Sequence, residues 1–175
     1  PDSVLIVYYS GHADASGLHL GDTTLPFDEL RAQVARSSAT LRLLVVDSCR
    51  SGGLTRVKGV RKGQAFEIAL DDSVAASGTA VITSSAAGED SQESDRLRGS
   101  FFSHHLTTGL RGAADRDANG EVTLTEAYQY AYSQTLRSSS RTLALQHPTY
   151  DYAIKGRGGV VLTRLSRARR STARL

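Results

Sequence analysis

The sequence predicts an α/β protein, a three-layer α/β/α sandwich around a mainly parallel sheet. Two apolar runs, at 4–9 and 41–46, have the composition of buried strands, and an amphipathic helix lies between them. Continuously apolar strands separated by a helix are typical of parallel β–α–β units, which connect in the right-handed sense. The length of 175 residues and the hydrophobic content of 39% suit one globular domain with a sizeable core.

The first half of the chain supplies most of the expected sheet. Three apolar residues at helical spacing, after a proline suited to a first turn, predict a helix within 25–37. Residues 51–78 carry many glycines and charges without a clear period, so we predict a long mobile loop there. A third strand is predicted at 79–85, and an acidic, polar loop follows it.

The second half is predicted to be mainly helical. A helix is expected at 100–110, with Ser100 as its N-cap and Gly112 as its stop. A second helix is expected at 123–136, and a turn then leads to a last strand near 160–163. These helices complete the outer layers of the sandwich.

Composition restricts the function classes. The chain lacks methionine altogether, and we expect it to be a fragment with one domain over 1–163 and a basic tail or linker over 164–175. No apolar run approaches the ~18 residues of a membrane span, so we expect no membrane segment and a cytoplasmic protein. The surplus of arginine lies mainly in the tail, where it is more typical of a solvated linker than of a nucleic-acid arm, so no nucleic-acid partner is expected.

Two predicted strands end in chemically active side chains. "YYSGH" ends the first strand at His12, and "LLVVDSC" ends the second at Cys49, the only cysteine of the chain. In an open parallel sheet, ligands gather beyond the carboxyl ends of the strands. An imidazole beside a thiol makes the nucleophilic thiolate accessible near neutral pH. The backbone amides of Cys49 and of Ala13 are the candidate donors to the oxyanion that attack on a peptide carbonyl would create.

Each of these residues also has a simpler interpretation. A lone cysteine on an apolar strand is usually a small core residue, and a histidine in a glycine-containing turn is usually only a turn residue. Their placement at the same end of two neighbouring strands favours the catalytic interpretation.

The paired motifs resemble the caspase–metacaspase clan of cysteine peptidases. Asp47-Ser48-Cys49 stand where caspases have Gln-Ala-Cys, and Asp-Ser-Cys with Ser-Gly-His is the metacaspase and bacterial caspase-like pattern. The resemblance covers nearly the whole chain and implies a caspase-like fold with His12 and Cys49 as catalytic dyad. Family members commonly have glycine after this histidine, where this chain has Ala13, but a backbone amide remains available.

The same resemblance implies a preference for basic substrates. Metacaspase-like enzymes cleave after Arg or Lys, and the residues matching their S1 pocket are Ser10 and Asp47. A carboxylate in a partly desolvated pocket suits a guanidinium or ammonium group by charge-assisted hydrogen bonding. The alternative is that Asp47 only caps the turn after its strand.

The basic residues that follow the nucleophile suggest self-processing. Relatives often cut themselves in this stretch, and residues 54–64 of this chain contain two arginines and two lysines. A solvated, charged loop is an equally good interpretation.

A calcium-loop pattern occupies 115–126. "DRDANGEVTLTE" fits D-x-[DN]-x-[DN]-G-x5-E, with side-chain ligands from Asp115, Asp117, Asn119 and Glu126 and a carbonyl ligand from Glu121. The same residues include the capping box T-x-x-E and ordinary turn chemistry. We expect no cofactor to be required for the chemistry, and Ca2+ is the candidate metal.

The sequence therefore leaves two functions open. The first is a cysteine endopeptidase acting on proteins or peptides with a basic residue before the scissile bond. The second is a catalytically silent, calcium-responsive interaction module on the same fold. Retention of both dyad residues favours the peptidase.

Overall fold

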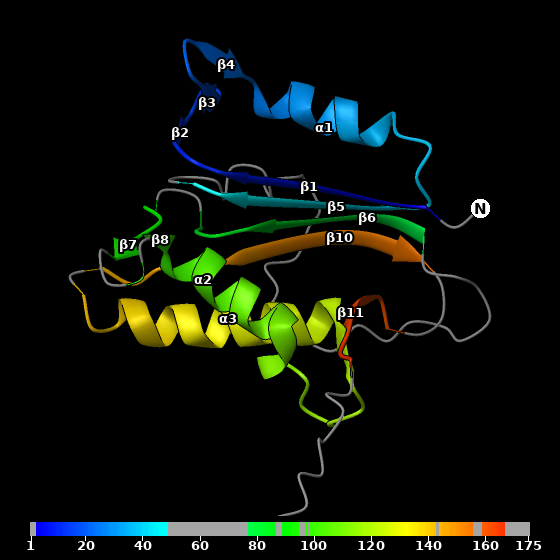
Figure 1. Cartoon of the computed structure of the whole chain (residues 1–175). Helices are drawn as coiled ribbons and strands as arrows, with labels where there is room; N and C mark the ends of the chain where they lie inside the picture. Colours follow the sequence, from blue (N-terminus) through cyan, green and yellow to red (C-terminus); the bar gives the residue numbers. More distant parts are fainter. Residues whose placement is uncertain are drawn as a thin grey trace, which may run out of the picture.

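The main sheet has four strands, and three of them run parallel (Figure 1). The computed structural model describes residues 3–48, 77–86, 89–94, 97, 99–142, 144–155 and 159–166. Across the sheet the order is β1 (Val4–Ser10), β5 (Leu41–Asp47), β6 (Ser77–Thr83) and β10 (Thr149–Lys155). β1, β5 and β6 are parallel, and β10 is antiparallel to β6. The predicted mainly parallel sheet is confirmed. The prediction that the first strand is buried is wrong, because β1 lies at the edge of the sheet and alternate residues along it are exposed.

Helices cover both faces of this sheet, as predicted (Figure 1). α1 (Phe27–Ala35) lies on one face, and α2 (Phe101–Thr108) and α3 (Leu124–Ser139) lie together on the other. Ser100 caps α2, as predicted, by accepting a hydrogen bond from the Ser103 amide. α2 continues into a π-helical turn, η2 (Gly109–Ala113), where Gly112 has the positive φ of 118° that ends the helix.

The central strand β5 joins two cores. Six of its seven residues are buried, which explains why it reads as one continuous apolar run. Leu44 and Val46 pack toward α1, and Leu43 and Val45 pack toward α2 and α3. Phe102 of α2 is fully buried in the second core.

Several short strands were not predicted. β2 (Ala13–Asp14), β3 (Gly17–Leu20) and β4 (Thr23–Leu25) form a small antiparallel sheet directly after β1. β7 (Glu93–Ser94) pairs with β8 (Gly99–Ser100), just before α2. Strands of two to four residues are too short for a hydrophobic period to reveal them.

The end of the sheet differs from the prediction. The predicted turn after the last helix is followed by a strand that was not predicted, β10, where Tyr150, Tyr152 and Ile154 alternate with other residues and pack toward α3. The predicted last strand exists as β11 (Val161–Arg164), but it pairs with β9 (Glu121–Thr123) away from the main sheet. The third strand also begins and ends two residues earlier than predicted.

Some predictions fall on residues that the structure does not describe. The predicted loop at 51–78 lies outside the described residues apart from its last two positions, and so does the tail from 167 onward. Within the described ranges, no helix is both long enough and apolar enough to span a membrane.

Candidate active site

The carboxyl ends of β1 and β5 lie side by side, at the end of the sheet where the parallel strands finish. Ser10 is the register partner of Asp47, and the Gly11 amide donates to the Asp47 carbonyl at 3.1 Å. β1, β5 and β6 all finish at this end of the sheet, near the β2–β4 sheet and the β7–β8 pair (Figure 1). The structure therefore brings the two predicted specificity residues together.

The turn that carries His12 is fastened by Tyr9. The Tyr9 hydroxyl donates to the His12 carbonyl at 2.7 Å and also to the His19 carbonyl at 2.8 Å, so the two oxygens share its proton. Burial raises the pKa of Tyr9, which keeps the phenol a hydrogen-bond donor. A Cβ atom at Gly11 would lie 2.7 Å from the Tyr9 hydroxyl oxygen, so glycine is what lets the ring pack across this turn. The His12 side chain is exposed.

The ladder after His12 directs the Ala13 amide away from its neighbour strand. The His19 amide donates to the His12 carbonyl at 2.9 Å, and Ala13 is the register partner of Leu18. In an antiparallel pair, the position next to such a bond is a non-hydrogen-bonded one. The Ala13 N–H therefore does not take part in this ladder, as an oxyanion donor would require.

Cys49 lies outside the described residues, but the residue before it is firmly held. Ser48 is buried, and its amide donates to the Ser84 hydroxyl at 3.1 Å. The Ser48 carbonyl accepts from the hydroxyls of Ser84 and Ser85, both at 3.3 Å. These two serines follow β6, so the third strand of the sheet anchors the segment that leads to the thiol.

Asp47 is buried, and its side chain reaches across to α2. Ser91 donates to Oδ1 at 2.8 Å, and Ser100 and Ser103 both donate to Oδ2. These contacts connect the carboxylate to distant parts of the chain, whereas the turn-cap alternative required only local ones. None of these three contacts was predicted from the sequence, and the N-cap pattern at Ser100 indicates no contact with Asp47.

A buried glutamine supports the loop that carries Ser91. The Gln146 side chain donates to the Ser84 carbonyl at 2.8 Å and to the Ser91 hydroxyl at 3.2 Å. Its amide oxygen accepts from the Gln92 amide at 3.0 Å. Nearby, Nδ1 of His147 lies 2.8 Å from a carboxylate oxygen of Glu89, and the two atoms share a hydrogen bond. Together these contacts fix the acidic loop against the end of β6.

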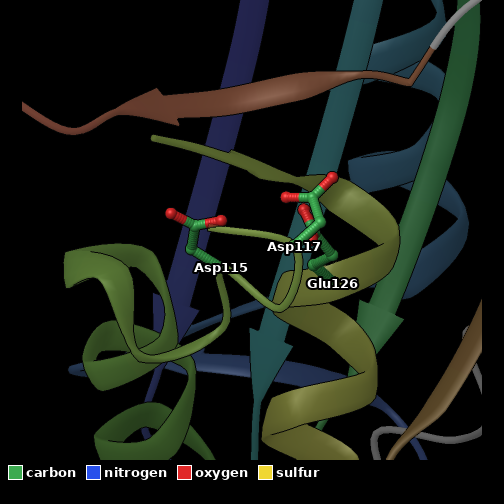
Figure 2. Close-up of side chains that lie close together, drawn as sticks. All are labelled: Asp115, Asp117 and Glu126. Atoms are coloured by element: carbon green, nitrogen blue, oxygen red, sulfur yellow. The ribbon is translucent and has the colours of Figure 1, made fainter. Parts of the chain in front are cut away.

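The calcium-loop pattern brings three carboxylates together at the start of α3. Ligand oxygens of Asp115, Asp117 and Glu126 all lie within 4.8 Å of one another. Figure 2 shows Asp117 and Glu126 adjacent, with Asp115 directed toward them from the other side of the loop. Gly120 has a φ of 85°, which gives the sharp turn that the pattern assigns to a glycine.

The same loop also forms the predicted helix cap. Glu126 accepts from the Thr123 amide at 2.9 Å, and the Glu126 amide donates to the Thr123 hydroxyl at 3.2 Å. Asn119 uses its side-chain oxygen to accept from the Glu121 amide at 2.7 Å. The two predicted interpretations of this segment are thus compatible in one geometry.

Comparison with known proteins identifies the family. A family model described as Caspase domain, of peptidase family C14, matches residues 1–151. The chain belongs to the caspase-domain family. The matched range contains Ser10, His12, Asp47 and Cys49, so the predicted resemblance is confirmed. No curated protein matches the chain.

A solved caspase structure is similar in fold. The crystal structure of caspase-1 from Spodoptera frugiperda superposes with a TM-score of 0.55 at 16% sequence identity. The superposition covers 93% of this chain and 64% of that chain, so this chain spans less than two thirds of the length of the caspase. The caspase-like fold that the motifs implied is thereby confirmed.

Proposed function

We propose that this caspase-domain protein is a cysteine endopeptidase that uses a His12–Cys49 dyad. The observation that carries the proposal is the parallel pairing of β1 with β5, which holds the His12 turn beside the strand that leads to Cys49. Membership of a peptidase family supports the same chemistry. The firmly bonded Ser48 and the Tyr9-fastened turn supply rigid supports, which a catalytic pair requires.

The proposed reaction passes through a thioester. His12 takes the proton of the Cys49 thiol, and the sulfur attacks the carbonyl carbon of the scissile peptide bond. The amides of Cys49 and Ala13 stabilise the resulting oxyanion, and the His12 imidazolium protonates the leaving amine as the C–N bond breaks. His12 then deprotonates a water molecule, which hydrolyses the thioester and restores the thiol.

Asp47 and Ser10 are proposed to select a basic residue before the scissile bond. Ser10 and Asp47 are register partners in parallel strands, so their side chains lie on the same face of the sheet. Asp47 is the buried member of this pair. A buried carboxylate attracts a guanidinium or ammonium group and repels an acidic side chain.

Fluorogenic peptides test the activity and the specificity together. Peptides that differ only in Arg, Lys or Asp before the reporter are compared, with Cys49→Ala as the inactive control. We expect cleavage after Arg and Lys, none after Asp, and none by the control. Preference for Asp would contradict the assignment of Asp47, and undiminished cleavage by Cys49→Ala would contradict the dyad.

Self-processing in 54–64 is proposed on the sequence alone, since that stretch lies outside the described residues. Intact-mass measurement of the purified protein and of Cys49→Ala tests it. Fragments that end after Arg56, Lys58, Arg61 or Lys62 in the active protein, and their absence from the variant, are the expected result. An intact active protein would exclude this step.

We also propose that the loop at 115–126 binds Ca2+ and tunes stability without entering the chemistry. The motif match and the convergence of three carboxylates support this proposal. If the peptide assays detect no cleavage, calcium-dependent capture of a partner protein would favour the silent interaction module instead.

A further inference from the structure

Hydroxyl groups from separate parts of the chain enclose the Asp47 carboxylate. They belong to Ser91 in the loop after β6, to Ser100 at the N-cap of α2, and to Ser103 in its first turn. Asp47 is only 3% exposed. A carboxylate removed from water needs such donors, because an ion without partners in the protein interior is costly. The donors also determine which way the carboxylate faces.

A fourth hydroxyl extends this arrangement to the surface. The Tyr8 hydroxyl oxygen lies 2.5 Å from the Ser103 hydroxyl oxygen. Because Ser103 gives its only proton to Asp47, the Tyr8 phenol is the donor in this contact. Tyr8 lies two residues before Ser10 on β1, so it shares the sheet face of Asp47, and it is 52% exposed.

The start of α2 favours a negative charge at the same point. The Ser100 hydroxyl accepts from the Ser103 amide at 3.0 Å and donates to Asp47, so the carboxylate lies at the first turn of the helix. The N-terminal end of a helix carries partial positive charge, which stabilises an anion there. Among the described residues, the three side chains that donate to Asp47 are all neutral hydroxyl groups.

We propose that Ser91, Ser100 and Ser103 form a hydroxyl clamp, completed by Tyr8, that aligns Asp47 for a basic substrate side chain. A carboxylate has about four acceptor positions, and the clamp occupies one on Oδ1 and two on Oδ2. The fourth, on Oδ1, is the one assigned to the substrate. These four are positioning residues, and their role rests on the proposed function.

The clamp is tested by comparing two substrates that differ only in charge. One peptide carries Arg before the scissile bond and the other carries citrulline, its neutral isostere, and kcat/KM is measured for both. The variants are Ser103→Ala, Ser103→Thr, Tyr8→Phe and Asp47→Asn, with the exposed helical substitution Ser133→Ala as the matched control.

We expect Ser103→Ala to lower the preference for Arg over citrulline by about tenfold, the order of one charge-assisted hydrogen bond. Tyr8→Phe should lower it less, Asp47→Asn should abolish it, and Ser103→Thr and Ser133→Ala should retain it. Loss of activity that is equal for both substrates, or an unchanged preference in Ser103→Ala and Tyr8→Phe, would overturn the clamp alone. A wild-type protein that does not distinguish Arg from citrulline would overturn the basic specificity, and the clamp with it.

Discussion

The Tyr9 hydroxyl donates a hydrogen bond to the backbone carbonyl of His12, with 2.7 Å between the two oxygen atoms. Tyr9 is the penultimate residue of β1, so the end of the strand holds the turn that follows it. The same hydroxyl reaches the His19 carbonyl in β3. The position of the proposed general base thus depends on a residue that points toward the α1 side of the sheet.

Tyr9→Phe should weaken both the turn and catalysis. Loss of this hydroxyl removes a donor from the His19 carbonyl and leaves the His12 carbonyl with the His19 amide, for an expected loss of about 1 kcal/mol in the free energy of unfolding. A less well-fixed imidazole should lower kcat by about tenfold while KM changes little. Urea denaturation and steady-state kinetics measure the two effects. An unchanged kcat would show that Tyr9 does not position His12.

Gly11→Ala should disturb the same contact between Tyr9 and the turn, this time by changing the turn. The added methyl group would meet the Tyr9 hydroxyl oxygen at 2.7 Å and the ring carbon that bears it at 3.0 Å, so the tyrosine must move. We expect a loss of about 1–3 kcal/mol from overpacking. Gly21→Ala is unsuitable as a control because of its positive φ, but Gly99→Ala has open space and should cost little. Equal stability of the Gly11 and Gly99 variants would contradict this packing.

Much of this architecture could be predicted from local pattern, and some of it could not. The positions of β1 and β5 follow from apolar runs, and the caps of α2 and α3 follow from local polar residues, so each was predictable. The exposure of alternate residues in β1 was not, because it depends on the place of β1 at the edge of the sheet. β10 alternates tyrosine with polar residues after a proline, which hid a strand whose burial depends on α3. The hydroxyl contacts of Asp47 join residues 44 to 56 positions apart, and no local pattern encodes such contacts.

The tyrosines between α3 and β10 should limit stability at alkaline pH. The rings of Tyr128, Tyr150 and Tyr152 are stacked, and burial raises the pKa of Tyr128 and Tyr150 above the ordinary value of 10.0. The unfolded chain then ionises first. The stabilisation that the neutral tyrosines give to the folded state is therefore complete below about pH 10 and is lost as the pH rises beyond it.

Tyr150→Phe should change stability differently at neutral and at alkaline pH. The Tyr150 hydroxyl is buried without a hydrogen-bond partner among the described residues, so its removal should stabilise the protein by about 1 kcal/mol at pH 7. It should also flatten the loss of stability above pH 10. Urea denaturation across the pH range is the measurement, and a destabilised variant at pH 7 would contradict the assignment.

Two substitutions should separate the helix cap from the proposed calcium ligand. Glu126→Gln keeps an oxygen for the capping box but removes the charge, so stability without calcium should barely change while calcium binding is lost. Thr123→Ala should cost about 1 kcal/mol through the lost cap and still bind calcium. The Tm with chelator reports the stability of each variant without calcium, and the rise in Tm on adding Ca2+ reports calcium binding. A wild-type Tm that Ca2+ does not raise would contradict the metal site.

The central claim is that His12 activates the thiol of Cys49, and reaction of that thiol tests it most directly. Because Cys49 is the only cysteine, the mass of a bound probe reports this residue alone. The rate of labelling by iodoacetamide at neutral pH is compared in the folded wild type, in His12→Ala and in both proteins unfolded in urea. We predict rapid labelling of the folded wild type, much slower labelling of folded His12→Ala, and equal rates after unfolding. Equal rates in the two folded proteins would contradict the dyad.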